Sequence, residues 1–226
     1  FIRNLAAGEI VGQVLAAAER IGDLPDNIVF MGMGEPLDNY EAVLAAVRIL
    51  NDPEGLAIGA RRITISTCGW VPGIERLKGE GLQIELSVSL HAPEDALRDR
   101  LMPVNRRYPL TTLMAACADY TAATSRIVTF EYTLVGGLND SRAQAQAVAR
   151  RVRPLGGRVN LIPLSPVEEF EGAAPDPDHV AAFQAVLEAA GVNTTVRRSK
   201  GSEISAACGQ LRRRLGGAAR DAGPVS

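Results

Sequence analysis

The chain has 226 residues, of which 46% are hydrophobic, and a formal net charge of −2. This length and composition suffice for one domain with a sizeable core, and the near-neutral charge does not favour nucleic-acid binding through the bulk field of the protein. Three cysteines without short spacing argue against a disulfide scaffold and favour a reducing compartment. Because there is no signal peptide and no apolar run near the roughly 20 residues of a membrane span, we expect a cytoplasmic protein.

Helical and extended patterns alternate along the chain. Apolar residues at Ile10, Val14 and Ile21 predict a first amphipathic helix, and Asn39 is suited to cap a second. Apolar or β-branched runs predict strands at residues 28–32, 62–67, 84–90, 127–134, 158–162 and 193–197. The intervening segments carry helical patterns at about 39–50, 72–79, 94–101, 111–123, 141–153 and 180–190.

This alternation indicates right-handed βαβ units and a parallel sheet. Since no GxGxxG motif follows the first strand, we predict an α/β fold built as a partial or complete (β/α) barrel, not a nucleotide-binding sheet. We expect residues 1–211 to form the core and the basic segment 212–226 to be a disordered tail. The chain begins with Phe1 and not with Met, so we expect that the start of the chain is missing.

Polar or glycine-rich segments follow five predicted strands, at residues 32–36, 66–69, 89–91, 136–140 and 163–166. Because the carboxyl ends of parallel strands meet at one edge, we expect these segments to form one pocket rim. Gly34 allows close approach of a ligand and Glu35 can pair with an ammonium group, although a simple turn would also explain both. Ser66 and Ser89 are candidates to donate to a carboxylate or ribose, or are only polar strand ends. For His91 we expect a structural hydrogen bond rather than proton transfer.

Cys208 lies among small and polar residues, with basic residues on both sides. A thiol near cations readily ionises to the reactive thiolate, and the alternative is an unreactive cysteine near a frayed terminus. We expect Cys68 and Cys117 to pack as apolar residues, and the cysteine spacing predicts no metal ligand. A second basic cluster is expected to be solvated surface or, at a pocket mouth, a phosphate site; it comprises Arg98, Arg100, Arg106 and Arg107.

Six motifs occur in order along the chain and together carry a resemblance to a known family. They are FIRNL at 1–5, GMGEP at 32–36, SLHAP at 89–93, PVNRRY at 103–108, VNLIP at 159–163 and AACGQL at 206–211. In these motifs the chain resembles the radical S-adenosylmethionine methyltransferases that act on carbon 2 of adenosine in large-subunit ribosomal RNA and in transfer RNA. The resemblance implies a partial (β/α) barrel of the radical S-adenosylmethionine type, with parallel strands, outer helices and the first strand missing from this chain.

The resemblance also implies roles for individual residues. Gly34 and Glu35 would contact the methionine end of S-adenosylmethionine, with Glu35 near its amino group. The rest of that site would be lined by Ser66, Ser89, Leu90 and His91. Where the family has an asparagine before a proline, this chain has Ser165, whose single hydroxyl would make a weaker or water-mediated contact.

The reaction implied by the resemblance uses Cys208 as the catalytic residue. Its sulfur would first be methylated, and a 5′-deoxyadenosyl radical from a second S-adenosylmethionine would then remove a hydrogen atom from that methyl group. The resulting carbon radical would add to the adenine ring, whose electron-poor carbon 2 does not accept an electrophilic methyl group. An upstream cysteine would release the product by forming a disulfide bond with Cys208.

The family further implies a 4Fe-4S cluster held by a CxxxCxxC motif, which we would expect just before Phe1 and which is absent from this chain. We therefore expect the chain alone not to methylate RNA. Ribosomal and transfer RNA are the implied substrates and a flavodoxin-type protein is the implied electron donor; we expect a monomer that does not bind membranes.

Three other functions remain as alternatives. A relative that methylates carbon 8 of adenosine would share Cys208 and the S-adenosylmethionine site. A metabolite-binding (β/α) barrel without radical chemistry would not depend on Cys208. An RNA-binding module would use the basic clusters and would show steeply salt-dependent affinity.

Overall fold

Six parallel strands form one sheet in the computed structural model, which describes residues 2–31, 34–165 and 172–197. The strands pair in chain order and are β1 (Ile28–Phe30), β2 (Ile63–Thr67), β3 (Glu85–Ser89), β4 (Val128–Leu134), β5 (Arg158–Pro163) and β6 (Asn193–Val196). Among the described residues β1 and β6 each pair with one neighbour, so the sheet is an open, partial barrel. The predicted fold class is thereby confirmed.

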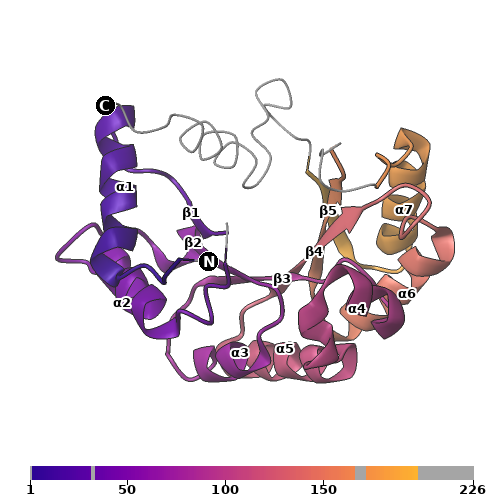
Figure 1. Cartoon of the computed structure of the whole chain (residues 1–226), viewed down its shortest axis with the longest axis horizontal. Helices are drawn as coiled ribbons and strands as arrows, with labels where there is room; N and C mark the ends of the chain where they lie inside the picture. The colour runs from indigo at the N-terminus through magenta and orange to yellow at the C-terminus, as the bar shows by residue number, and fades with distance from the viewer. Residues whose placement is uncertain (1, 32–33, 166–171, 198–226) are drawn as a thin grey trace, which may run out of the picture.

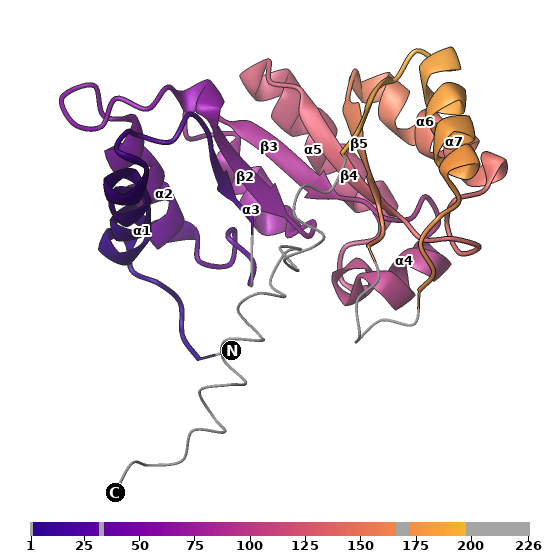
Figure 2. The same ribbon diagram turned by 90° about the horizontal axis from the view of Figure 1, so that it is seen from above.

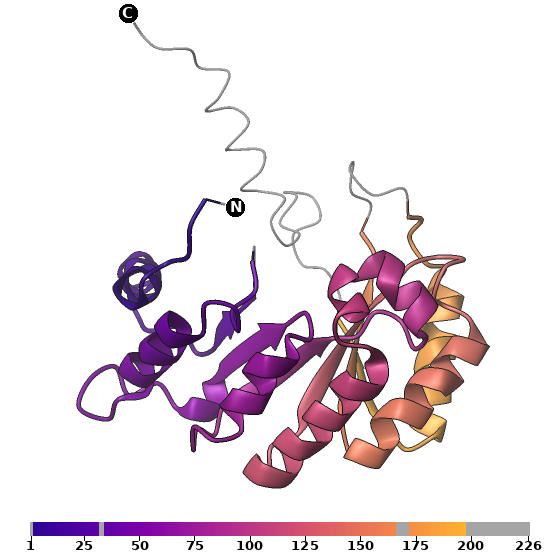
Figure 3. The same cartoon turned by 60° about the horizontal axis from the view of Figure 1, so that its bottom comes forward.

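The helices lie outside the curved sheet (Figure 1). They are α1 (Ala7–Ile21), α2 (Tyr40–Asn51), α3 (Val71–Leu77), α4 (Asp95–Leu101), α5 (Leu110–Thr124), α6 (Arg142–Val152) and α7 (Pro177–Ala189). Helices α1 and α2 lie together at one end of the sheet and α6 and α7 at the other (Figure 2), with α3 and α5 side by side between them (Figure 3). No helix in the described part of the chain is long and apolar enough to cross a membrane.

The two faces of the sheet differ in chemistry. Side chains that face the helices are apolar and buried, among them Ile63, Ile65, Leu86, Val88, Phe130, Tyr132, Val159 and Leu161. The alternate positions, on the inner face, are polar and include Ser66, Ser87, Ser89, Thr129, Glu131, Thr133 and Asn160. A closed barrel fills its interior with bulky branched side chains. Here the core lies only between sheet and helices, and the inner face remains available to a ligand.

A fully buried arginine joins the ends of two strands. Arg98, in α4, donates from Nη2 to the carbonyl oxygens of Cys68 and Ser89, both at 2.8 Å, and from Nε to that of Leu90 at 3.1 Å. Its Nη1 donates at 2.9 Å to Oδ1 of Asn105. These bonds join the residue after β2 to the end of β3, so Arg98 fixes the carboxyl ends of β2 and β3 relative to each other.

Asn105 links Arg98 to two aspartates by hydrogen bonds. Its Nδ2 donates to Oδ1 of Asp95 at 2.9 Å and to Oδ1 of Asp99 at 2.7 Å. The pKa of Arg98 is lowered by burial, an effect that nearby acidic groups oppose. Gly69 gives the guanidinium room, because a Cβ there would lie 3.1 Å from Nη2 of Arg98 and the backbone φ is +103°.

A second buried polar residue holds the loop after β4. Asn139 donates from Nδ2 to the carbonyl oxygens of His91 at 2.8 Å and Thr133 at 2.7 Å, and its Oδ1 accepts from the backbone N–H of Val135 at 2.7 Å. Asp140 accepts from the N–H of Gly137 at 3.0 Å. The loop after β4 is therefore fixed by its own polar side chains.

Two expectations from the sequence need correction. Asn39 occupies the N-cap position of α2, as expected, but its side chain makes no capping hydrogen bond; its Nδ2 donates instead to the carbonyl oxygen of Leu5, 2.9 Å away, and tethers the segment before α1. Arg98 does not belong to a solvated or phosphate-binding cluster, because its guanidinium is buried and donates hydrogen bonds to backbone carbonyl groups. Arg100, Arg106 and Arg107 are exposed as expected.

Replacing Arg98 tests its structural role. Arg98→Met removes the side-chain donor of the carbonyl groups of Cys68 and Ser89 and leaves Asn105 Oδ1 without its arginine partner, so we expect the free energy of unfolding to fall by about 3 kcal/mol or more. Arg100→Met, at an exposed position of the same helix, should change it by less than about 0.5 kcal/mol. Denaturant unfolding measures both, and equal effects would refute the role assigned to Arg98.

Candidate functional site

A cavity of about 310 Å³ lies at the carboxyl ends of the strands, where the inner face meets the loops. Its lining residues are Met31, Gly34, Glu35, Pro36, Ser66, Thr67, Cys68, Ser89, His91, Glu131, Thr133 and Ile162. Five residues predicted to bind a cofactor thus share one cavity: Gly34, Glu35, Ser66, Ser89 and His91. These residues are far apart in the sequence, but they meet because the strands that they follow or end are parallel neighbours in the sheet.

Glu35 connects the loop after β1 to the end of β2. Its Oε1 accepts from the backbone N–H of Leu37 at 2.9 Å, and its Oε2 accepts from the N–H of Cys68 at 2.7 Å. Gly34 precedes it with φ of +99°, a conformation that L side chains rarely adopt. The carboxylate is therefore held at the pocket wall by two backbone donors, and its remaining lone pairs can accept from a ligand.

His91 is a structural hydrogen-bond acceptor, as expected. Its Nδ1 accepts from the backbone N–H of Thr133 at 3.0 Å. Burial, with a smaller contribution from the charge of Arg98, lowers the pKa of His91 to about 4. The neutral ring therefore carries its proton on Nε2, which makes that nitrogen the donor on the other side of the ring.

Glu131 is a pocket residue that the sequence analysis missed. It is 6% exposed, and its two carboxylate oxygens accept from Oγ of Ser87 at 3.1 Å and from Nδ2 of Asn160 at 2.8 Å. Burial raises its pKa, against the lowering effects of these two hydrogen bonds and of the charge of Arg197. The available signal was a charged residue in the middle of the otherwise uncharged run VTFEYTL at 128–134.

Cys68 also lines the pocket, so the expectation that it only packs as an apolar residue was incomplete. Burial, followed by the neighbouring carboxylate of Glu35, raises the pKa of its thiol to about 12. Cys68 is therefore a protonated thiol at neutral pH and not a nucleophile. Cys117 is fully buried in the core, as expected, and both cysteines are free.

Other predicted residues lie elsewhere. The side chain of Leu90 is buried in the core, and only its backbone adjoins the pocket segment. Ser165 follows β5 and is half-buried, but it does not line the cavity. His179, in the first turn of α7, is exposed and contacts Asp140 through Nδ1 at 3.1 Å. Cys208 and the tail at 212–226 lie outside the described residues.

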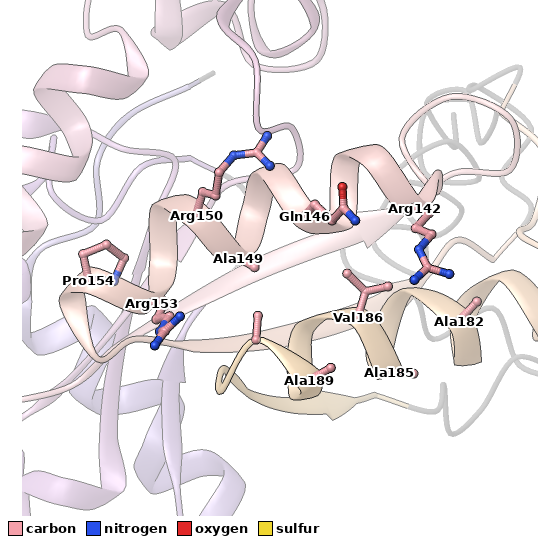
Figure 4. Close-up of a pocket in the computed structure, with 11 residues that line it drawn as sticks. Arg142, Gln146, Ala149, Arg150, Arg153, Pro154, Ala182, Ala185, Val186 and Ala189 are labelled. Carbon is pink, nitrogen blue, oxygen red and sulfur yellow. The ribbon is translucent and has the colours of Figure 1, made fainter.

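A larger groove, of about 910 Å³, lies on the outer surface between α6 and α7 (Figure 4). Its floor consists mainly of alanines, such as Ala149 and Ala185, and arginines line its sides, among them Arg142 and Arg150. It contains none of the predicted site residues. The smaller cavity, with its convergent carboxylates and hydroxyls, is the better candidate for a functional site.

The described residues offer no set of ligands for an iron–sulfur cluster. Within residues 2–31, 34–165 and 172–197, no group of three or more histidine, cysteine or acidic side chains is placed to hold a metal ion. Cys117 is enclosed in the core, and Cys68 lies alone at the pocket wall. These residues do not fit a 4Fe-4S cluster.

The fold and the pocket define a radical S-adenosylmethionine protein. The sequence pattern described as "Radical SAM superfamily" matches residues 5–146. A crystal structure of a radical SAM methyltransferase from Sphaerobacter thermophilus superposes with a TM-score of 0.90 and is 53% identical, covering 94% of this chain and 63% of that chain.

Two curated relatives are each described as a probable dual-specificity RNA methyltransferase RlmN. That of Desulforudis audaxviator is 52% identical over 214 residues, which cover 95% of this chain and 67% of the relative. That of Moorella thermoacetica is 52% identical over 215 residues, which cover 93% and 61%. The chain belongs to the RlmN family of radical S-adenosylmethionine methyltransferases and spans about three fifths to two thirds of the length of these relatives. The family implies S-adenosylmethionine and a 4Fe-4S cluster as cofactors.

The lowered pKa of His91 predicts a pH dependence of stability. Between the ordinary pKa of 6.5 and the folded value of about 4, the unfolded chain binds more protons than the folded one. The stabilisation is therefore complete above pH 6.5 and is lost as the pH falls toward 4, by up to about 3 kcal/mol.

Comparison with His91→Asn isolates this contribution, because asparagine tolerates the left-handed backbone of this position (φ +55°) and does not titrate. The variant keeps an acceptor for the N–H of Thr133 in its amide oxygen, and because it does not titrate, its stability should fall less between pH 6.5 and 4 than that of the wild type. Denaturant unfolding across this range measures the difference. Parallel pH profiles would contradict the assignment.

Proposed function

We propose that this chain forms the S-adenosylmethionine-binding core of an enzyme that methylates carbon 2 of adenosine in large-subunit ribosomal RNA and transfer RNA. The observation that supports it most directly is the single cavity that brings together Gly34, Glu35, Ser66, Ser89 and His91. Relatives more than 50% identical, described as dual-specificity RNA methyltransferases, support the substrate class.

The proposed ligand fits the chemistry of the cavity wall. Glu35 presents a carboxylate, already oriented by two backbone N–H groups, to the ammonium group of the methionine end. Ser66 and Ser89 place hydroxyl groups along the inner face, and His91 offers a neutral N–H. When bound, S-adenosylmethionine supplies an electrophilic methyl group on a sulfonium and a 5′-deoxyadenosyl group.

Cys208 is the proposed acceptor of the first methyl group. Its sulfur would form a bond to the methyl carbon as the bond from that carbon to the sulfonium breaks, and the thiol proton would be lost. Cys68 lines the proposed S-adenosylmethionine cavity. It remains a thiol because its pKa is raised to about 12, so it does not compete as a nucleophile. The described residues provide no ligand set for the cluster.

The role of Glu35 can be tested by ligand binding. Glu35→Gln keeps an acceptor for one backbone N–H but removes the negative charge, so we expect the affinity of the chain for S-adenosylmethionine to fall at least about tenfold. Glu54→Gln, an exposed position before β2, is the matched control and should bind like the wild type. Isothermal titration calorimetry measures both, and equal affinities would exclude the proposed contact.

The role of Cys208 can be tested with the full-length gene product, reconstituted with its cluster under anaerobic conditions. We expect methylated adenosine in ribosomal and transfer RNA fragments, a gain of one methyl group on Cys208, and loss of both in Cys208→Ala. Cys117→Ala, in the core, should retain methylation. Mass spectrometry that places the methyl group on carbon 8 would support the related methyltransferase, and RNA methylation by Cys208→Ala would refute the mechanism.

A further inference from the structure

A chain of side-chain hydrogen bonds crosses the inner face of the sheet from β3 to β6. Ser87 Oγ donates to Oε1 of Glu131, and Asn160 Nδ2 donates to its Oε2 at 2.8 Å. Thr195 Oγ1 donates at 3.0 Å to Oδ1 of Asn160, which leaves the amide nitrogen facing Glu131. The carboxylate of Glu131 is therefore fixed in one orientation, and each oxygen keeps a lone pair that these bonds do not use.

Glu131 gives the cavity a second negative charge. None of the ion pairs among the described residues includes Glu131 or Glu35. The charged group that most affects Glu131 is Arg197, which follows β6 and is exposed. A buried carboxylate without a close cation is costly, and a cationic ligand would offset that cost.

The two carboxylates are held by different strands of the sheet. Glu35 is bonded to the backbone at the end of β2, and Glu131 belongs to β4, two strands further along the sheet. Neighbouring strands are about 4.8 Å apart, so the two strands are separated by roughly 10 Å. A ligand with two positive centres can thus place one near each carboxylate.

We propose that Glu131 recognises the sulfonium charge of S-adenosylmethionine and thereby distinguishes this cosubstrate from its neutral thioether product. The inference rests on the proposed function, in which Glu35 takes the ammonium group of the same ligand. The sulfonium lies three bonds along the side chain from the carbon that carries the ammonium group, in the direction of the nucleoside. S-adenosylhomocysteine has the same amino acid, ribose and adenine but lacks the methyl group and the positive charge.

The test is to measure the affinities of both ligands for the 226-residue chain. Glu131→Gln is nearly isosteric; its amide oxygen can accept from Asn160, and its amide nitrogen can donate to the hydroxyl of Ser87. We expect the variant to lose at least about tenfold in affinity for S-adenosylmethionine and to bind S-adenosylhomocysteine with little change. The ratio of the two dissociation constants is the readout, and Glu19→Gln, an exposed position in α1, is the matched control.

A second variant guards against a general loss of structure. Glu131→Asp keeps the charge but shortens the side chain, so its preference for the sulfonium ligand should exceed that of Glu131→Gln. An equal loss for both ligands would make Glu131 a hydrogen-bond acceptor for the shared nucleoside, and an unchanged ratio would make it purely structural; either result overturns the inference. A wild-type chain that binds neither ligand would overturn the proposed function as well.

Discussion

The guanidinium group of Arg98 carries the hydrogen bonds on which the geometry of the site depends. It reaches from α4 into the core and binds the carbonyl oxygens of Cys68 and Ser89, so the ends of β2 and β3 cannot move apart independently. The N–H of Cys68 in turn binds Glu35. One buried cation thus positions, through the backbone, residues that themselves line the cavity. Its charge also helps to keep His91 neutral.

Much of the fold could be predicted because its signals are local. The apolar runs of the strands and the stripe of α1 place the elements within a few residues of their observed bounds, and the alternation of strands and helices predicts parallel order. Asn39 shows the limit of this reasoning. The residue has the right type and position for a cap, yet its side chain bonds to Leu5, a contact 34 residues away that no local pattern encodes.

Site residues at the ends of strands were predicted from the sequence, whereas a site residue in the middle of a strand was missed. Gly34, Glu35 and Ser66 follow or end their strands, where polar residues are conspicuous, and they line the cavity. Glu131 lies in the middle of β4, and only the pairing of β4 with β3 and β5 brings it beside Ser87 and Asn160. Arg98 was misjudged because a sequence shows clustering of charge but not burial.

The hydrogen-bonded inner face has a consequence for how a ligand would bind. Hydrogen bonds already fix the rotamers of four side chains before any ligand binds, namely those of Ser87, Glu131, Asn160 and Thr195. A flexible polar wall would lose conformational entropy as it closed on a ligand, by about 0.5–1.5 kcal/mol for each side chain that becomes immobilised. The side chains of this face lose that conformational entropy during folding, so a smaller entropic cost is subtracted from the free energy of binding. The rigidity of this face also restricts the shapes of ligand that it can accept.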